Sequence, residues 1–313
     1  MARERTEDWK TQEPPTADDG RLNSEARMSR SIRIGDIEIT ALNDGMSRLP
    51  AMFFPGLDVG VHPEVLDQDG TVHIPTGCFL VRTGDRTILI DAGIGPVSVE
   101  YPEGMPRAKA AAGEPKPKLA EGGRLPEALG RAGAKPDEID TVFLTHLHPD
   151  HVGWVAPGRR PYFPNARILF GAADWQPLVA DAVPGTPGFE VLDGLKAAHA
   201  AERTDPIDGD MVPVAPGLTA RHSPGHTPGS YVVIVSSGPD RAYLLGDVVA
   251  CPLQLTENDI SFITDVDPAL AARTRESLFR ELEGQQAAIG MDHFPGLEFQ
   301  RILTGAGRQW VTF

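Results

Sequence analysis

The densest group of metal-binding side chains in this sequence is THLHPDH at residues 145–151, which directly follows the apolar run TVFL at residues 141–144. The apolar run predicts a buried strand, and a loop at the carboxyl end of a strand lets alternate side chains converge. Three of the chain's nine histidines fall in this loop, and neutral imidazole is the commonest nitrogen ligand of zinc. Pro149 stiffens the turn, which favours a preorganised metal-binding loop.

Three further ligand candidates stand where other predicted strands end. They are His226 in SPGHTPG (223–229), Asp247 after YLLG (243–246) and His293 in MDHFP (291–295). A lone histidine or aspartate at a strand end is commonly solvated or caps a turn, so each is weak evidence by itself. Together with the first stretch they supply seven ligands, enough for two metal ions that share a bridging carboxylate. The predicted ligands are His146, His148, Asp150, His151, His226, Asp247 and His293.

The charge balance excludes some classes of partner. The chain has 313 residues, with 29 Lys and Arg against 44 Asp and Glu, which gives 29 − 44 = −15. Such a surplus repels phosphate backbones and anionic lipids, so neither nucleic acid nor a membrane surface is an expected partner. The sequence has no run of about 18 apolar residues and no apolar stretch near the N-terminus typical of a secretory signal. Two cysteines, Cys78 and Cys251, are too few for a disulfide framework, so we expect a cytoplasmic protein.

The order of the predicted elements indicates a layered α/β fold. Two hairpins come first, around turns at 35–36 and 84–85, and strands and helices alternate after the strand at 141–144. Further strands are predicted at 167–170, 218–222, 231–235, 242–245 and 287–291, and helices at 126–132, 173–181, 195–203 and 268–283. The last helix is the clearest, because Asp267 can cap it and Pro268 suits its first position.

Two segments show no regular period. Residues 1–30 are interpreted as a flexible N-terminal arm, with an arm that clamps a partner subunit as the alternative. Residues 95–124 are rich in Gly, Pro, Ala and Lys and are too long for an ordinary connection. We therefore expect them to form a disordered loop, or the lid or rim of a site.

The ordered set of ligands resembles the pattern of the metallo-β-lactamase fold hydrolases, in which HxHxDH precedes a distant histidine, a bridging aspartate and a last histidine. The resemblance covers roughly residues 31–310. It implies a four-layer αβ/βα sandwich, with residues 31–313 as one domain of two halves and the site at the edge between them. The similarity is closest to the branch of methyl parathion hydrolase and lactonase-like enzymes. The stretches that carry it are GDIEITAL at 35–42, HLHPDHVG at 146–153 and HFPG at 293–296.

The resemblance also implies a role for each ligand. His146, His148 and His226 would bind one metal ion, Asp150, His151 and His293 would bind the other, and Asp247 would bridge the two. Asp91, in LIDAG at 89–93, matches the aspartate that orients a ligand in this family. A nitrogen-rich set with carboxylates suits two zinc ions, with manganese, cobalt or iron as alternatives.

The ligand set predicts hydrolysis. Two divalent cations roughly 3.5–4 Å apart can hold a bridging hydroxide at neutral pH. We expect that hydroxide to attack a small ester, lactone or phosphotriester, with Asp150 passing a proton to the leaving group. Acylhomoserine lactonases of the family usually have a tyrosine three residues after the bridging aspartate, where this chain has Ala250. The alternative is a redox enzyme of the same fold with one iron, similar to the persulfide dioxygenases.

The apolar stretch between the hairpins, residues 46–61, has two interpretations that stay open here. Its side chains, Phe53 and Phe54 among them, either fill the core or a dimer interface, or line a pocket for an apolar substrate. The stretch and the N-terminal arm are compatible with a homodimer. The expected partner in catalysis is a small-molecule substrate.

Overall fold

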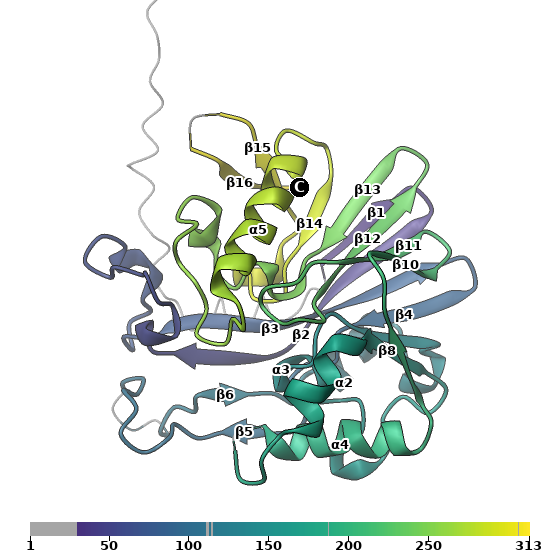
Figure 1. The fold of residues 1–313 in the computed structure, drawn as a ribbon, viewed down its shortest axis with the longest axis horizontal. Coiled ribbons are helices and arrows are strands. Elements are labelled where there is room, and N and C mark those ends of the chain that lie inside the picture. Colours follow the sequence, from purple (N-terminus) through teal and green to yellow (C-terminus); the bar gives the residue numbers. More distant parts are fainter. Residues whose placement is uncertain (1–29, 111–112, 114, 187, 306) are drawn as a thin grey trace, which may run out of the picture.

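The computed structural model describes residues 30–110, 113, 115–186, 188–305 and 307–313. Within them, two β-sheets pack face to face and helices cover the outer face of each sheet (Figure 1). This is the predicted four-layer αβ/βα sandwich. The predicted N-terminal arm lies outside the described residues except for Arg30, which already pairs with Ala41 in the first strand.

The first sheet has nine strands within the described residues, in the order β5–β6–β2–β3–β4–β7–β8–β9, with β1 also paired to β2. Its strands β4, β7, β8 and β9 run parallel. Parallel strands are covered on both faces, which explains why TVFL in β7 is apolar without alternation. The bounds are β1 (Arg30–Ile34), β2 (Ile37–Leu49), β3 (Val72–Thr83), β4 (Arg86–Ile90), β5 (Ser98–Val99), β6 (Ala120–Glu121), β7 (Thr141–Leu144), β8 (Arg167–Gly171) and β9 (Thr204–Ile207).

The second sheet has seven strands in sequence order, β10 to β16, in the described part of the chain. Only the β13–β14 pair among these neighbours is parallel, and α5 forms the connection between its two strands. The bounds are β10 (Met211–Ala215), β11 (Leu218–His222), β12 (Tyr231–Ser237), β13 (Asp240–Leu244), β14 (Ala288–Gly290), β15 (Gln300–Leu303) and β16 (Gln309–Thr312).

Three layers of apolar side chains hold the sandwich together. The two sheets bury Val81 and Phe143 of the first sheet against Val233 of the second. Helices α2 (Leu125–Arg131) and α4 (Phe189–Ala200) pack on the outer face of the first sheet. Helix α5 (Pro268–Leu282) packs on the outer face of the second sheet, and Asp267 caps it by accepting a hydrogen bond from the Leu270 N–H at 2.9 Å. In the described part of the chain, no helix has the length and apolar character needed to span a membrane.

Two predicted helices differ from the observed elements. The segment predicted as a helix at 173–181 is a 3₁₀ turn, Ala172–Asp174, followed by a π-helical turn, Trp175–Ala180. Pro177 lies inside it and has no N–H to donate, so a regular α-helix cannot form there. Helix α4 replaces the predicted 195–203, because Gly194 lies inside the helix instead of breaking it. A Cβ at Gly194 would lie 2.4 Å from the Ala156 carbonyl oxygen, so only glycine allows this close packing.

Residues 46–61 and 95–124, for which the sequence left two interpretations open, have more regular structure than predicted. A β-bulge between Asn43 and Gly45 lets β2 continue to Leu49, so the apolar stretch 46–61 begins inside a strand. The ends of the 95–124 segment pair as β5 and β6, and its Tyr101 and Leu119 are buried in the same apolar cluster as Phe54. The expectation of a disordered loop is therefore wrong for the described residues of this segment.

Candidate metal centre

All seven predicted ligands meet at the edge of the sandwich where strands of both sheets end. His146 and His148 follow β7, and Asp150 and His151 lie on α3 (Pro149–Val152) in the same loop. The second half supplies one ligand from the β11–β12 turn, one from the 3₁₀ turn after β13 and one from the segment after β14. These are His226, Asp247 and His293. The first half of the chain thus supplies four of the seven, and neither half contains the whole set.

Three imidazoles form the first group, which we call the three-histidine cluster (His146, His148 and His226). The Nδ1 atom of His148 lies 3.1 Å from His146 Nε2 and 2.9 Å from His226 Nε2. Asp247 Oδ2 lies 3.3 Å from His226 Nε2 and 3.8 Å from His146 Nε2. The four ligand atoms converge tightly enough to hold one cation.

One carboxylate and two imidazoles form the second group, which we call the mixed cluster (Asp150, His151 and His293). The two oxygens of Asp150 lie 3.9 Å from His151 Nε2 and 3.6 Å from His293 Nε2. Asp247 Oδ1 lies 3.2 Å from His151 Nε2 and 3.1 Å from His293 Nε2. Asp247 therefore presents one oxygen to each cluster, which is the geometry a bridging ligand needs.

Buried atoms without hydrogen bonds support the fit of cations to these clusters. His151 Nε2, Asp247 Oδ1 and His293 Nε2 are buried and, apart from their close approach to one another at 3.1–3.2 Å, have no hydrogen-bond partner. A buried polar atom left without a partner costs about 1–3 kcal/mol, more for a charged group, and a cation would satisfy all three. The nitrogen and carboxylate donors also suit divalent cations, so the residues fit two such ions.

The protonation states of the three-histidine cluster favour cation binding. Burial lowers the pKa of His146 well below its usual range and that of His148 to about 3. Both rings are therefore neutral at pH 7 and keep a lone pair for a cation.

The mixed cluster has the opposite electrostatics. Burial alone would lower the pKa of His293, but the charges of Asp247 and Asp150 outweigh it and raise that pKa to about 9. The pKa of His151 is likewise raised, against its burial, chiefly by Asp247 and Asp91. A cation entering this cluster must therefore displace protons from both imidazoles near pH 7.

Asp91 lies beside His151, where the sequence predicts a ligand-orienting aspartate. His151 Nδ1 donates to Asp91 Oδ2 at 2.9 Å, which directs Nε2 toward the cluster. Thr145 holds the carboxylate in place through its N–H and its hydroxyl, both at 2.7 Å. Asp91 itself has a φ of +59°, an uncommon backbone conformation outside glycine.

Sequence reasoning missed the groups that hold the rings of His226 and His293. His226 Nδ1 donates to Asp265 Oδ1 at 2.8 Å, and His293 Nδ1 donates to the Pro75 carbonyl at 2.7 Å. Each bond leaves Nε2 free to face its cluster. Asp292 is a further buried carboxylate 3.4 Å from His151 Nδ1, and burial and the charge of Asp91 raise its pKa. No spacing signal in the sequence points to Asp265, which lies 39 positions from His226.

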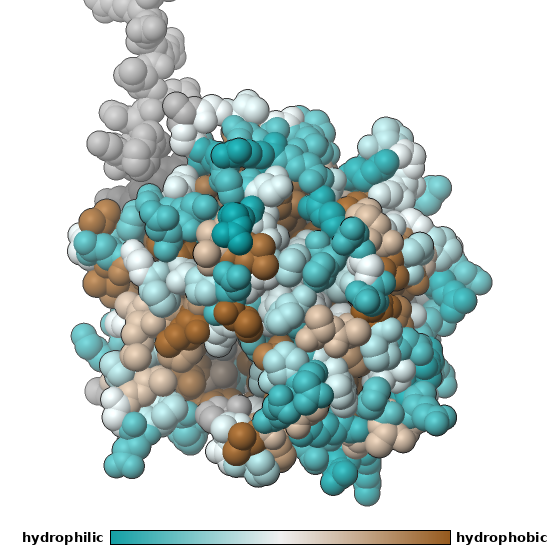
Figure 2. Space-filling view, in the orientation of Figure 1, coloured by the Kyte–Doolittle hydropathy of each residue, from teal (hydrophilic) through white to brown (hydrophobic). Residues whose placement is uncertain are grey.

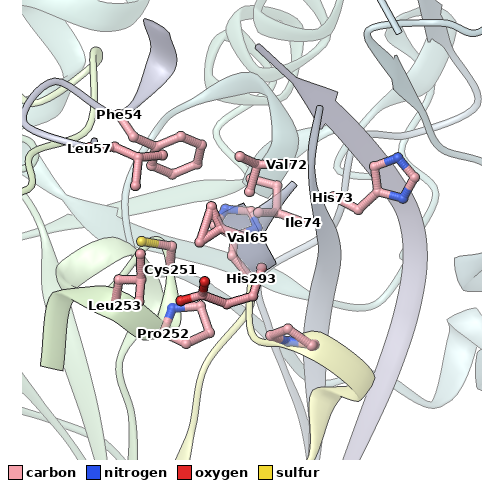
Figure 3. A pocket seen from close by; sticks show the side chains of 12 residues that line it. Phe54, Leu57, Val65, Val72, His73, Ile74, Cys251, Pro252, Leu253 and His293 are labelled. Carbon is pink, nitrogen blue, oxygen red and sulfur yellow. The ribbon is translucent and has the colours of Figure 1, made fainter. Parts of the chain in front are cut away.

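An apolar cavity of about 240 Å³ opens beside the mixed cluster (Figure 3). Its lining includes His293, and most of its other side chains come from the 46–61 stretch, β3 and the segment after Asp247. The lining residues are Phe54, Leu57, Glu64, Val65, Val72, His73, Ile74, Cys251, Pro252, Leu253, His293 and Pro295. Phe54 and Leu57 fit both the pocket and the core interpretation of residues 46–61. They line the cavity, and they also pack in a core cluster with Phe262.

The molecular surface near residues 46–61 is also apolar. On the face in Figure 2, hydrophobic side chains gather beside a hollow on the left, the side on which β5 and β6 lie in Figure 1. Met52 and Val61, from the 46–61 stretch, are 53% and 65% exposed. The predicted homodimer stays a prediction.

The fold and the paired His/Asp clusters together define a metal-dependent hydrolase of the α/β sandwich type. The sequence profile of the Metallo-beta-lactamase superfamily matches residues 74–289, and the chain belongs to this family. The match confirms the predicted fold and family.

Curated relatives support the predicted lactonase-like branch. The N-acyl homoserine lactonase of Bacillus thuringiensis is 25% identical over 222 residues, which are 71% of this chain and 82% of the relative. The N-acyl homoserine lactonase AiiB of Agrobacterium fabrum is 35% identical over 98 residues, 31% of this chain and 33% of the relative.

Solved structures share the fold. The dizinc quorum-quenching lactonase AidC, in complex with its product, aligns with a TM-score of 0.74 at 23% identity, covering 92% of this chain and 98% of that one. The hydrolase AbOPH aligns with a TM-score of 0.72 at 23% identity, covering 91% and 97%.

Proposed function

We propose that this protein hydrolyses small, neutral lactones or esters that carry an apolar substituent, and that it does so with two zinc ions. One observation carries the proposal: an apolar cavity borders His293 of the mixed cluster, which shares Asp247 with the three-histidine cluster. The lactonase relatives point to the same reaction class.

The chain's own residues would divide the work. When bound, two divalent ions supply Lewis acidity that activates water and polarises a carbonyl near neutral pH. Asp247 would hold the two clusters in register, with one oxygen toward each. The Asp150 side chain is 31% exposed, whereas Asp247 is 2% exposed. Asp150 is therefore the carboxylate placed to exchange a proton with solvent and pass it to the leaving group.

The cavity favours a particular kind of substrate. Its volume of about 240 Å³ is below the ~300–1,000 Å³ typical of sites that enclose drug-sized ligands, so it suits the substituent of a small molecule. Aliphatic and aromatic side chains form most of the lining, while Glu64 adds a carboxylate to it. A carboxylate there, on a chain with a net charge of −15, disfavours anionic substrates and assists release of a carboxylate product.

Ala250 distinguishes the chemistry of this site from that of acylhomoserine lactonases. It is 1% exposed and packs in the apolar cluster that contains Phe54 and Cys251. An alanine methyl cannot donate a hydrogen bond to a substrate carbonyl, so polarisation would depend on the cations alone at this position. We therefore expect substrates with good leaving groups to react fastest.

Two donor clusters favour a dinuclear hydrolase over the alternative of a one-iron redox enzyme. Elemental analysis of purified protein separates the two, because the proposal expects about two zinc ions per chain and the alternative expects one iron. An iron-dominated content of one per chain would contradict the proposal.

A substrate panel tests the reaction. We expect hydrolysis of γ-lactones and aryl esters whose rate rises with an apolar substituent, is lost on chelation and returns with Zn²⁺. An aryl phosphotriester in the same panel tests the third predicted substrate class. Glu64→Gln provides the matched control, since it should improve anionic substrates without improving neutral ones. Full zinc loading with no turnover of any lactone or ester would overturn the proposal.

A further inference from the structure

A buried carboxylate outside the predicted ligand set connects the two loops that carry the three-histidine cluster. Asp174 ends the 3₁₀ turn after β8 and is 0% exposed. Its Oδ2 accepts a hydrogen bond from the Leu147 N–H at 3.2 Å, between His146 and His148 in the sequence. On the other side, Oδ1 accepts from the Gly229 N–H at 2.6 Å, three residues after His226.

A third hydrogen bond also joins Asp174 to the His226 turn. The Thr227 hydroxyl donates to Asp174 Oδ2 at 2.8 Å, and Thr227 directly follows His226. Ser230 completes the turn by accepting from the Thr227 N–H at 3.1 Å. Both carboxylate oxygens are therefore used, and each half of the sandwich contributes donors.

The backbone around Asp174 is shaped for this contact. A Cβ at Gly229 would lie 2.8 Å from the Asp174 carboxyl carbon, and a Cβ at Gly171 would lie 2.1 Å from the Gly229 carbonyl oxygen. Real Cβ atoms do not approach other atoms so closely, so both positions need glycine. The two glycines bring the His226 turn against the end of β8, within reach of the carboxylate.

The cluster depends on this approach because its histidines come from different halves of the chain. His146 and His148 follow β7 of the first sheet, while His226 lies between strands of the second. Ligands must be held closely to bind a cation well, and groups that orient them affect metal affinity by about 10–100-fold.

We propose that Asp174 is a positioning residue that sets the spacing of the His146–His148 loop and the His226 turn, and thereby the cation affinity of the three-histidine cluster. The proposal rests on the metal binding in the proposed function and is independent of the substrate.

Zinc titration of variants tests this without an activity measurement. Asp174→Asn keeps the size of the side chain but replaces one acceptor oxygen with a donor amide, so at least one of the three hydrogen bonds is lost. It is combined with His293→Ala, which leaves the three-histidine cluster complete, and separately with His226→Ala, which leaves the mixed cluster complete. Competition with a chelating dye gives the Zn²⁺ affinity of each double variant.

The expected result is selective. Asp174→Asn should weaken Zn²⁺ binding about 10–100-fold in the His293→Ala background and change it less than about threefold in the His226→Ala background. Thr227→Val removes one donor and leaves the carboxylate intact, so it should cause a smaller loss in the same background. The second variant also keeps the test valid if Asp174→Asn does not fold.

Asp44→Asn is the matched control. Asp44 is also a 0% exposed carboxylate with several donors, including the Leu125 N–H and the Trp154 Nε1–H, both at 2.8 Å, and it contacts neither loop of the three-histidine cluster. It should lower the melting temperature without selective loss of zinc. The proposal would be overturned if Asp174→Asn lowered the zinc affinity of both clusters equally, or no more than Asp44→Asn does. It would also be overturned if the wild-type chain bound no zinc. Normal zinc binding without lactone or ester hydrolysis would instead contradict only the proposed substrate.

Discussion

The three-histidine cluster and the mixed cluster lie on opposite sides of Asp247, but they differ in how ready they are for a cation. Burial keeps His146 and His148 neutral, so the first cluster offers free lone pairs at pH 7. In the mixed cluster the surrounding carboxylates raise the pKa of His293 to about 9, against the effect of its burial. The comparison teaches that carboxylates which complete a ligand set also make protons compete with the cation.

The two clusters also differ in their surroundings. His293 borders the apolar cavity, whereas none of the three histidines of the other cluster is among the residues that line it. Both clusters are tied to buried carboxylates. Asp174 holds the loops of the three-histidine cluster and Asp265 holds the ring of His226, while Asp91 holds the ring of His151 in the mixed cluster. The two clusters therefore differ in position, because the mixed cluster borders the cavity that we propose takes the apolar substituent of a substrate.

Replacing Asp247 should have the largest effect, because it removes the group shared by both clusters. We expect Asp247→Ala to lower metal content and activity together, with activity falling by about 1,000-fold or more, since each ion contributes several kcal/mol to the transition state. Elemental analysis and steady-state rates on the same preparation measure both. Retention of two ions per chain would count against a bridging role.

Lowering the pH should separate the clusters. Below about pH 9 a cation must displace a proton from His293, and the raised pKa of His151 adds a second proton, so the affinity of the mixed cluster should fall at least about tenfold per pH unit. The pKa of His148 is about 3, so protonation of this ring should not weaken the three-histidine cluster over the same range. Metal content after equilibration at pH 8 and pH 6 in a fixed chelator buffer should therefore drop toward one ion per chain. Loss of both ions over the same pH range would contradict the predicted difference between the two clusters.

The stability of the metal-free protein should depend on pH in the opposite direction to the metal affinity of the mixed cluster. Attraction between protonated His293 and Asp247 stabilises the folded state below the unfolded pKa of about 6.5 and is lost as the pH rises through about 9. Melting temperatures measured between pH 6 and 9 after chelation should accordingly fall as the pH rises.

Removing the orienting carboxylates should affect one cluster each. Asp265→Asn should weaken the ion of the three-histidine cluster about 10–100-fold, because its single uncharged amide oxygen cannot accept from both His226 Nδ1–H and the Phe262 N–H, which now use one carboxylate oxygen each. Asp91→Asn should act in the same way on the mixed cluster through His151. Zinc titrations of the two variants should show two distinct sites, with a different one weakened in each. Identical titration curves for the two variants would show that the clusters do not act separately.

The convergence of the seven predicted ligands could be foreseen, because they stand where predicted strands end and their order matches a known pattern. The aspartates that support them could not. Asp174 lies 27 positions from Leu147 and 55 from Gly229, so only tertiary packing shows that its carboxylate joins two ligand loops. Asp265 lacks a local signal for the same reason.

Fold class was predictable from the alternation of strands and helices, while element boundaries depended on exceptions to local rules. Pro177 sits inside a π-helical turn, and Gly194 sits inside α4 because of a close contact with Ala156. A bulge near Gly45 extends β2 beyond the segment that hairpin signals identify. The Gly194 exception follows from packing against a segment distant in sequence, while Pro177 acts locally through its missing N–H.

The smallest expected effect concerns the substrate side of the mixed cluster. Phe54 lines the cavity beside His293, while its neighbour Phe53 packs near the same Phe262 ring without lining it. If the whole 46–61 stretch lined the pocket, alanine at either position would raise KM for apolar substrates, but of the two only Phe54 is among the lining residues. We expect Phe54→Ala to raise KM about tenfold for substrates with an apolar substituent, as for a lost contact of 1–3 kcal/mol, and Phe53→Ala to leave KM within about twofold. Both variants should lose stability, so melting temperatures serve as the control. Unchanged KM in both, together with loss of a dimer on gel filtration, would assign the stretch to an interface instead.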